Sequence, residues 1–494
     1  MNIDKCVFNV NEVRKSDFFL INNVGIPSTV LMENASVKCS LLILEKVNPE
    51  SVLIMTGTGN NGGDGYAIAR NLYLSNINVV IACLGEPVSE ACKINRKICE
   101  NLGISIIPSE NLSAISRVKF DTFVDSGFGS GFNGELPEHV LKINKFVSRR
   151  NVIKVAIDNV SGLNLETGDV SEGTLRADIT IAVGAYKKGY FSNQGLRYSG
   201  QIYLVDIGLI FEDYGECWKI FEKTDFVLPD RKHFFHKGAA GKVAVIGGSR
   251  KYTGAPLLSA SAAYNSGAGY VYCLLPQELK NSNFYRPDEI IFEYTEKKDI
   301  KKTIDFINEK VDTLLAGPGT DFEYDRKYWL ELFKGLKNKN IIIDADLFKI
   351  LSPADLKIKG NNFILTPHIV EFAEFIKKDY KKMDIIKEFE AFAKKYPDLF
   401  LILKKPGTLI SYKGEKFVVP RIADSLAHAG TGDVLGGIIA GFCAQSHILN
   451  TEVIISAVFA HVYTALRLSE KKFTGSITPT DIILNMGEYV YELR

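Results

Sequence analysis

Short runs of apolar, often β-branched residues alternate with helical segments along almost the whole chain. In the first half these runs predict strands at 51–57, 78–85, 120–126, 152–158, 178–186 and 201–208. The alternation is typical of α/β layers around a mostly parallel sheet. Because the runs are almost continuously apolar, we expect helices to cover both faces of the sheet, as in a doubly wound fold.

The alternation lapses at residues 212–235, where the sequence becomes charged, aromatic and turn-like. The lapse predicts two domains, at 1–212 and 226–494. A second series of strands is predicted at 241–249, 311–319, 340–346, 361–368 and 399–407, followed by helices at about 432–445 and 452–469. The longest apolar stretch, 434–444, is shorter than the roughly 18 residues that span a membrane, so it predicts a buried helix.

Composition narrows the choice of partners. The chain has 494 residues, enough for two or three domains, and its 59 Lys and Arg stand against 58 Asp and Glu. The net charge of +1 argues against a strongly basic nucleic-acid binder and favours small molecules. The eight cysteines include no C-x-x-C pair, and the first residues lack the apolar core of an export signal. We expect a cytoplasmic homo-oligomer that binds neither nucleic acid nor membrane.

The first glycine-rich turn follows the predicted strand 51–57 and leads into a helix. Gly57, Gly59 and Gly62 match G-x-G-x-x-G, and Glu86 ends the next strand where a dinucleotide site has a ribose-binding carboxylate. A turn that only joins strand to helix explains the same glycines. The amides and carboxylate of 60–65 favour a ligand site, since helix N-terminal amides bind phosphate. Asp64 is equally explained as a favourable charge on the helix dipole.

Polar residues end two further predicted strands. Asp125 precedes a loop with glycines at 127, 129, 131 and 134, and Asp158 precedes Ser161. Because the carboxyl ends of parallel strands meet at one crevice, we expect Asn61, Asp125, Asp158 and Ser161 to lie close together. Four oxygen-bearing side chains suit a hard cation or a hydroxylated substrate, although an aspartate at a strand end is often only a cap.

The second half has its own signal at 428–442, where small residues precede an apolar helix. Gly430, Thr431 and Gly432 leave backbone amides free at the helix start, and these can hold a phosphoryl group. Asp433 can then take the proton from a substrate hydroxyl, unless it only stabilises the first helical turn. Lys404 and Lys405 can neutralise phosphates or be surface residues, and Glu371 can order magnesium through water.

The first half resembles the NAD(P)H-hydrate epimerase family, also called the YjeF N-terminal family, over about 210 residues. The resemblance rests on VLMENAS at 30–36, GNNGGDG at 59–65, the glycine loop 125–135 and AIDNVSG at 156–162. It implies a Rossmann-like fold, a potassium ion held by Asn61, Asp125 and Ser161, and Asp158 as the residue that contacts the hydrated nicotinamide and handles protons. The implied substrate-binding residues are Asn60, Asn61, Gly62, Gly63, Asp64, Gly129, Ser130, Gly131, Phe132, Asn133, Gly134, Glu135 and Asp158. The family usually has proline where Val160 stands.

The second half is similar to the ADP-dependent NAD(P)H-hydrate dehydratase family, which has the ribokinase-like fold. The match rests on 241–271, 316–319, 344–346, 366–368 and the 428–442 signal. It implies that the hydrate is contacted by Ala255, Gly319, His368 and Asp433. The implied binding residues for ADP, with its magnesium ion, are Lys404, Lys405, Pro406, Gly407, Thr408 and Gly432. The chain departs from the family at Ile369, Val370, Lys405 and 423–428.

Together the two resemblances imply a bifunctional repair enzyme. Its first domain would interconvert R- and S-NADHX and NADPHX, and its second would dehydrate the S form with ADP, or ATP, releasing AMP and phosphate. Three alternatives stay open. One is a ribokinase-like vitamin or small-molecule kinase fused to a non-catalytic ligand-binding module. Another is an N-terminal scaffold like that of an mRNA-decapping protein, and the third is a plain Rossmann dehydrogenase.

Overall fold

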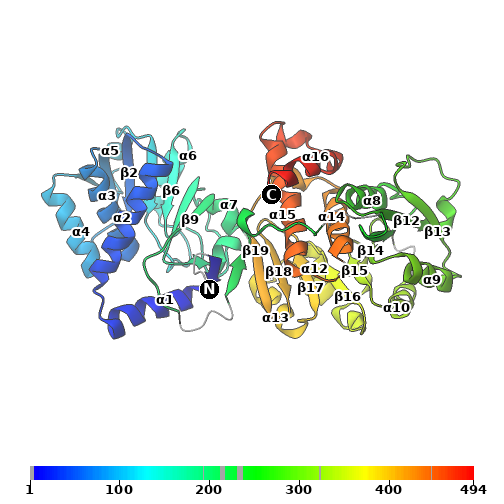
Figure 1. Cartoon of the computed structure of the whole chain (residues 1–494). Helices are drawn as coiled ribbons and strands as arrows, with labels where there is room; N and C mark the ends of the chain where they lie inside the picture. Colours follow the sequence, from blue (N-terminus) through cyan, green and yellow to red (C-terminus); the bar gives the residue numbers. More distant parts are fainter. Residues whose placement is uncertain (1–4, 193, 212–216, 231–236, 322–323, 447) are drawn as a thin grey trace. The chain divides into compact units, whose positions relative to one another are not determined.

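The computed structural model describes residues 5–192, 194–211, 217–230, 237–321, 324–446 and 448–494. The chain divides into two compact units, Met1–Lys219 and Ile220–Arg494 (Figure 1). The predicted domains 1–212 and 226–494 fall inside these units, and residue 212 itself lies outside the described residues.

The first unit is built on a seven-stranded sheet whose pairings are all parallel. The strand order is β4 (Ser105–Pro108), β3 (Asn78–Cys83), β2 (Ser51–Thr56), β5 (Thr122–Ser126), β6 (Ile153–Ile157), β7 (Ile179–Val183) and β9 (Gln201–Val205). All six strands predicted in this half are present. The sequence pattern missed β4, which is short and only partly buried.

Helices cover both faces of this sheet, which confirms the doubly wound prediction. Val52 and Ile54 of β2 join the core formed with α2 (Ser28–Lys46), α3 (Asn60–Leu74) and α4 (Glu90–Asn101). Leu53 and Met55 point to the opposite face and pack with α5 (Leu112–Ile115) and α6 (Glu138–Ser148). Successive residues of a strand face opposite sides, so an apolar run is what a doubly covered strand requires.

An N-terminal segment is attached to this unit by a short strand pairing. Val7 of β1 (Cys6–Phe8) lies opposite Trp218 of β10 (Trp218–Ile220) and opposite Tyr186 of β8 (Tyr186–Lys187). The chain then forms α1 (Val10–Phe19), which continues into a π-helical turn at Leu20–Val24. Asn9 caps α1 reciprocally with Glu12, so the helix has a defined start.

The second unit has a sheet that is parallel over seven strands and continues into an antiparallel hairpin. The order is β13 (Ile291–Thr295), β12 (Tyr270–Pro276), β11 (Lys242–Ile246), β14 (Thr313–Ala316), β15 (Asn340–Ile343), β16 (Asn362–Leu365), β17 (Leu399–Leu403), β18 (Thr408–Tyr412) and β19 (Glu415–Val419). The five strands predicted here are present. The pattern missed β12, β13 and the β18–β19 hairpin, in which buried and partly exposed positions are mixed.

The core of the second unit lies between this sheet and four helices. They are α8 (Gly254–Asn265), α14 (Thr431–Ser446), α15 (Thr451–Ser469) and α16 (Pro479–Tyr491). The other helices are α9 (Ile300–Lys310), α10 (Arg326–Gly335), α11 (Leu347–Ile350), α12 (Ile369–Ile376) and α13 (Ile385–Lys395). The apolar stretch 434–444 is the buried helix α14, as predicted. Among the described helices only α15 is long and apolar enough to cross a membrane, and 72% of that stretch is buried inside the unit.

Helices α8 and α14 approach closely because two glycines of α14 face α8. A Cβ atom on Gly437 would lie 2.2 Å from the carbonyl oxygen of Ser259, and one on Gly441 would lie 2.7 Å from that of Ala263. Both distances are shorter than van der Waals contact. The position of the N-terminus of α14 over the sheet therefore depends on these glycines.

We expect Gly437→Ala to destabilise the second unit by about 2 kcal/mol, because a backbone oxygen cannot move away as a flexible side chain can. Gly487→Ala in α16 is the matched control, since no atom beyond its own helical turn lies within 4 Å of its Cβ position. The control should be neutral or stabilising by up to ~1 kcal/mol. Calorimetric unfolding of the full chain measures both, and a Gly437→Ala variant as stable as the parent would contradict the close packing.

Candidate functional site

A cavity of about 550 Å³ lies in the first unit where strands β2, β5 and β6 end. Its polar lining includes Asp64, Asp158 and Lys187, and its apolar lining includes Leu31 and Leu209. Eight residues predicted to bind substrate line it: Asn60, Asn61, Asp64, Gly129, Ser130, Gly131, Phe132 and Asp158. The other predicted residues, Gly62, Gly63, Asn133, Gly134 and Glu135, are not among those that line the described cavity.

The glycines at the start of α3 serve packing more than ligand approach. A Cβ atom on Gly62 would lie 1.9 Å from the carbonyl oxygen of Gly57, and one on Gly63 would lie 2.6 Å from Cε of Met32. Only the preceding Gly59, which lines the cavity, has open space at its Cβ position. The glycine-rich turn thus seats α3 against β2 and α2, and this leaves the amides of Asn60 and Asn61 beside the cavity.

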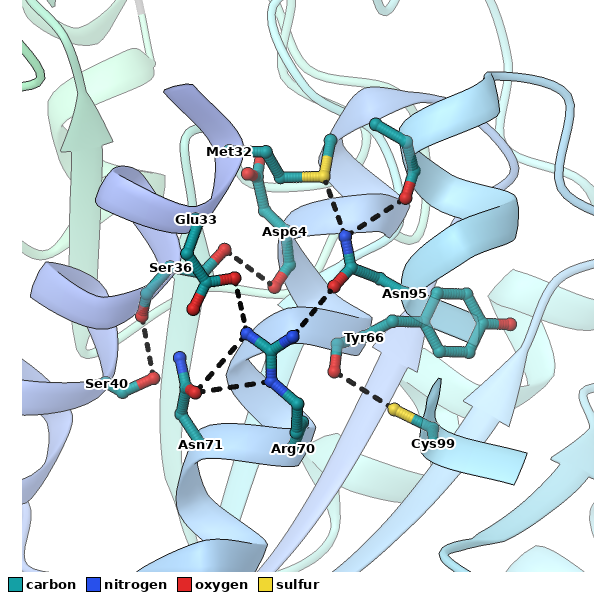
Figure 2. A network of polar contacts seen from close by, with 11 residues as sticks. Met32, Glu33, Ser36, Ser40, Asp64, Tyr66, Arg70, Asn71, Asn95 and Cys99 are labelled. Atoms are coloured by element: carbon teal, nitrogen blue, oxygen red, sulfur yellow. Dashed lines mark hydrogen bonds and ion pairs between the residues drawn. The ribbon is translucent and has the colours of Figure 1, made fainter. Parts of the chain in front are cut away.

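A polar network fixes α2 and α4 against α3 (Figure 2). Arg70 of α3 places Nη2 2.5 Å from Oε2 of Glu33 on α2 and donates from Nη1 to Oδ1 of Asn95 on α4. Asn95 in turn donates to Sδ of Met32, which lines the cavity. Hydrogen bonds to a charged guanidinium are among the stronger ones. The network therefore holds the apolar side of the cavity in place.

Asp158 is the residue most tightly held at the cavity. It follows β6 directly and has a left-handed backbone with φ of 60°, which is uncommon outside glycine. Oδ1 lies 2.5 Å from Nζ of Lys187, and Oδ2 accepts a hydrogen bond from the backbone N–H of Ser130. The Lys187 side chain is only 2% exposed. Tyr190 donates its hydroxyl hydrogen to the backbone carbonyl of Asp158, so both ends of this residue are fixed.

Asp125 and Ser161 lie together beneath the cavity. Ser161 donates to Asp125 from its hydroxyl at 2.5 Å and from its backbone N–H at 2.8 Å. Burial raises the pKa of Asp125, while the hydrogen bonds from Ser161 and Gly127 lower it. Among the described residues, the buried side-chain amide of Asn61 has no hydrogen-bond partner for either of its polar atoms. The Cβ position of Gly129 is 3.1 Å from Asn61 and 3.3 Å from Asp158, so the glycine loop brings the two sides together.

These residues fit a monovalent cation. Asn61, Asp125 and Ser161 offer amide, carboxylate and hydroxyl oxygens, which are ligands for hard cations. The single carboxylate matches one positive charge, and the unpartnered Asn61 amide is a buried polar group that still requires a partner. The donor set and its burial support the predicted ion site.

Three residues of the N-terminal helix α1 also line the cavity: Val13, Arg14 and Asp17. Burial raises the pKa of Asp17 to about 6, Lys187 lowers it, and Asp158 raises it. Burial also raises the pKa of Asp64 well above its usual range, with Asp158 and Asp17 adding to the effect. The sequence reasoning missed Arg14, Asp17 and Lys187.

Glu86, predicted to bind a ribose, instead pairs with Arg96 at 2.9 Å and is not among the residues that line the cavity.

In the second unit a lysine and an aspartate pair where two parallel strands end. Nζ of Lys404, directly after β17, lies 2.8 Å from Oδ1 of Asp344, directly after β15. Asp344 is 2% exposed and Lys404 19%. Desolvation lowers the pKa of Lys404, but Asp344 and Glu371 outweigh it and the net shift is upward. The sequence motif included Asp344 without giving it a role.

Asp433 lies in the first turn of α14, beside this pair. Its neighbour Gly432 has its Cβ position 3.4 Å from Nζ of Lys404, and Ser259 donates its hydroxyl hydrogen to the backbone carbonyl of Asp433. The pKa of Asp433 is raised to about 7, mainly by burial. Asp344 also raises this pKa, and Lys404 lowers it. A carboxyl group that titrates near neutral pH suits proton transfer. The N-terminus of a long helix is also a favourable place for a phosphoryl group.

His368 and Glu371 flank the Lys404–Asp344 pair at the start of α12. Nδ1 of His368 accepts from the N–H of Glu371, and Glu371 accepts from the N–H of His368 at 2.8 Å. Burial raises the pKa of Glu371 to about 7, Lys404 lowers it, and Asp344 raises it. Burial and Lys404 lower the pKa of His368. His368 therefore has a capping role, while its half-exposed ring still allows it to contact a ligand.

The remaining predicted residues of this unit fall into two groups. Gly319, with φ of 66°, has its Cβ position 3.2 Å from Cβ of Ala255, so these two lie side by side. Lys405 folds back and donates to the carbonyl oxygens of Pro406 and Gly407, and Thr408 donates to the carbonyl of Lys405. Burial lowers the pKa of Lys405 to about 7. The side chain of Lys405 thus stays within the turn between β17 and β18, whereas that of Lys404 reaches Asp344.

Comparisons with known proteins agree with this division. A family model described as NAD(P)H-hydrate dehydratase matches residues 243–486, and a model of the YjeF-related protein N-terminus matches residues 28–189. A bifunctional NAD(P)H-hydrate repair enzyme of Dictyoglomus turgidum is 31% identical over 96% of each chain. The enzyme of the same name from Helicobacter pylori is 30% identical over 96% of this chain and 97% of its own.

The fold of the second unit has a counterpart among solved structures. A ribokinase-like superfamily protein from Enterococcus faecalis matches with a TM-score of 0.50 and 24% identity, over 58% of this chain and 98% of its own. At this identity the match shows the fold alone. It confirms the ribokinase-like architecture predicted for the second half of the chain.

Because the pKa of Asp433 is raised in the folded chain, we expect the free energy of unfolding to depend on pH. The folded chain keeps a proton on Asp433 up to about pH 7, whereas the unfolded chain releases it near its ordinary pKa of 3.8. Stability is therefore lost as pH rises between these values. Asp433→Asn should be more stable than the parent by about 4 kcal/mol at pH 8, with the difference vanishing near pH 4. Urea unfolding at both pH values measures this, with the exposed Asp398→Asn as control; a pH-independent difference would contradict the assignment.

Proposed function

The chain belongs to the family of bifunctional NAD(P)H-hydrate repair enzymes, and from this premise we propose how its two units divide the work. The first unit interconverts the R and S epimers of NADHX and NADPHX. The second unit dehydrates the S epimer with ADP, releasing AMP and phosphate. The observation that carries the proposal is that each unit brings a fixed Lys–Asp pair and a further carboxyl group to the ends of its parallel strands.

In the first unit Asp158 is the proposed proton acceptor. The substrate carbon that changes configuration bears a hydroxyl group and the ring nitrogen. Lys187 and the Ser130 N–H orient the two oxygens of Asp158 at the cavity. A carboxylate in hydrogen-bond reach of the hydroxyl can take its proton. The apolar side of the cavity, including Leu31, Met32 and Ala35, would hold the ring. Asn60, Asn61, Asp64 and the loop Gly129–Phe132 are the polar residues we expect to contact the rest of the substrate.

In the second unit Asp433 is the proposed base for phosphoryl transfer. Removing the proton from the C6 hydroxyl lets its oxygen attack the terminal phosphorus of ADP, and AMP leaves. The C6–O bond then breaks with release of phosphate and C5 loses a proton, so that the ring double bond forms and NAD(P)H is restored. The amides at the start of α14 and the ammonium group of Lys404 would stabilise the charge on the transferring group. Ala255, Gly319 and His368 are the expected contacts of the hydrate, and Lys405–Thr408 those of the nucleotide.

Magnesium would reach this site with the nucleotide. No three His, Cys, Asp or Glu residues converge as metal ligands in the described part of the chain. Magnesium keeps several waters and takes substrate phosphates as ligands, so it does not require a protein cage. Glu371, 3.9 Å from Nζ of Lys404, is the residue we expect to contact those waters. When bound, the ion would offset the negative charge of the phosphates.

Purified full-length chain tests both activities in one assay. With ADP and magnesium it should restore NADH absorbance from S-NADHX directly and from R-NADHX after epimerisation. Asp158→Asn should slow recovery from the R epimer by about 100-fold and leave S turnover intact, and Asp433→Asn should abolish recovery from both while epimers still interconvert. Thermal unfolding of each variant checks that it folds. Recovery of neither epimer by the parent chain would overturn the proposal.

If potassium binds at Asn61, Asp125 and Ser161, the rate of epimerisation should depend on the potassium concentration. Epimerisation should be faster in potassium chloride than in choline chloride at equal ionic strength, while S turnover serves as the internal control. Ser161→Ala removes one oxygen ligand, so the potassium concentration for half-maximal epimerisation should rise roughly tenfold. Equal epimerisation rates in the two salts would rule out a functional ion at this position.

A further inference from the structure

Helix α1 places one side of its surface in the first unit's cavity. Arg14, Asp17 and Ile21 are three and four residues apart, which puts them on one side of the helical segment, and all three line the cavity. The family model of the YjeF-related protein N-terminus starts at residue 28, so α1 lies outside that match.

The orientation of α1 is fixed by its other contacts. Val13 and Leu20 pack in a core cluster with Leu31 and Leu209, and the buried hydroxyl of Ser16 accepts a hydrogen bond from the N–H of Ile210 at 2.9 Å. At the cavity, Nη2 of Arg14 donates to the carbonyl of Ser130 in the glycine loop. Because core contacts and loop contacts lie on adjacent sides of the helix, Asp17 is held at the cavity by the packing of the whole helix.

Asp17 shares the cavity with three charged or titratable groups on other elements. They are Asp158 after β6, Lys187 at the end of β8, and Asp64 in α3; Arg14 is the charged neighbour on its own helix. Lys187 forms its ion pair with Asp158, at 2.5 Å. Asp17 has no such cation at hydrogen-bond distance among the described residues. Burial and Asp158 favour its protonated form, and they raise its pKa to about 6 although Lys187 opposes them. Two carboxyl groups in different environments, one paired with a lysine and one not, are the usual arrangement for acid–base pairs.

The chemistry requires such a pair. When the C6 hydroxyl loses its proton, the C6–N bond can break with its electrons going to nitrogen, and a C=O bond forms at C6. The nitrogen then requires a proton. Closure of the ring on the opposite face reverses each step, so that no proton is consumed and nothing is oxidised or reduced. One group must accept a proton while another donates one.

We propose that Asp17 is the second proton-transfer residue of the first unit, donating to the ring nitrogen as Asp158 accepts from the hydroxyl. This assignment rests on the epimerase function proposed above. It makes α1 a part of the catalytic site and not only a cover of the core.

The test measures epimerisation of R-NADHX by full-length variants between pH 5 and 9. Asp17→Asn should lower kcat by about 100-fold with KM changed less than about threefold, and it should lose the fall in rate that the parent shows as pH rises and the donor deprotonates. Asp17→Glu should regain most of the rate. Lys15→Gln, which removes a charge from the exposed side of α1, is the matched control and should equal the parent. ADP-dependent turnover of S-NADHX should be the same in all four proteins.

Two results would overturn this assignment. Parental rates and pH profile in Asp17→Asn would show that Asp17 only lines the cavity. A loss that is equal at every pH and is not regained by Asp17→Glu would show a packing role. If the parent chain itself did not interconvert the epimers, the epimerase function would fail, and that outcome is separate from either of these.

Discussion

A lysine held against an aspartate that directly follows a parallel strand is the interaction on which each unit's site depends. Lys187 pairs with Asp158 in the first unit, and Lys404 pairs with Asp344 in the second. An ammonium group withdrawn from water requires a partner, and removing either partner of a buried pair typically costs about 3 to 5 kcal/mol. Each pair fixes one carboxylate. Burial raises the pKa values of the carboxyl groups beside each pair, and the carboxylate of the pair adds to the effect; these groups are Asp17 and Asp64 in the first unit and Glu371 and Asp433 in the second.

Close backbone packing brings these groups together. In the first unit Gly62 and Gly63 let α3 start directly against β2 and α2. In the second, Gly437 and Gly441 let α14 lie on α8, which sets the position of Asp433 at the helix start. The same type of residue thus seats a helix N-terminus at each sheet, although the two units have different folds. A helix that starts at this edge presents its unpaired amides to whatever binds there.

The sequence was sufficient where a residue's position followed from strand periodicity. Asp125, Asp158 and Asp344 end apolar runs. Parallel pairing alone therefore brings Asp125 and Asp158 to one edge of the first sheet, and Asp344 to the corresponding edge of the second. Lys187 was missed because its strand is only two residues long and it is followed by Lys188, as in many surface segments. Asp17 was missed because α1 has exposed Phe18 and Phe19 on one side, which hides the amphipathic pattern. Its place at the cavity comes from tertiary contacts that no local pattern encodes.

The pairing of β1 with β10 has a consequence for how the first unit assembles. The sulfur atoms of Cys6 and Cys217 lie 3.1 Å apart although 211 positions separate them in the chain. Closing a loop of this length costs about 5 kcal/mol in chain entropy. During synthesis α1 leaves the ribosome first, yet it cannot be fixed until the strand that contains Trp218 has emerged. We therefore expect the sheet and glycine loop to form on the nascent chain before the cavity receives Arg14 and Asp17, so that epimerisation is the last property the first unit acquires.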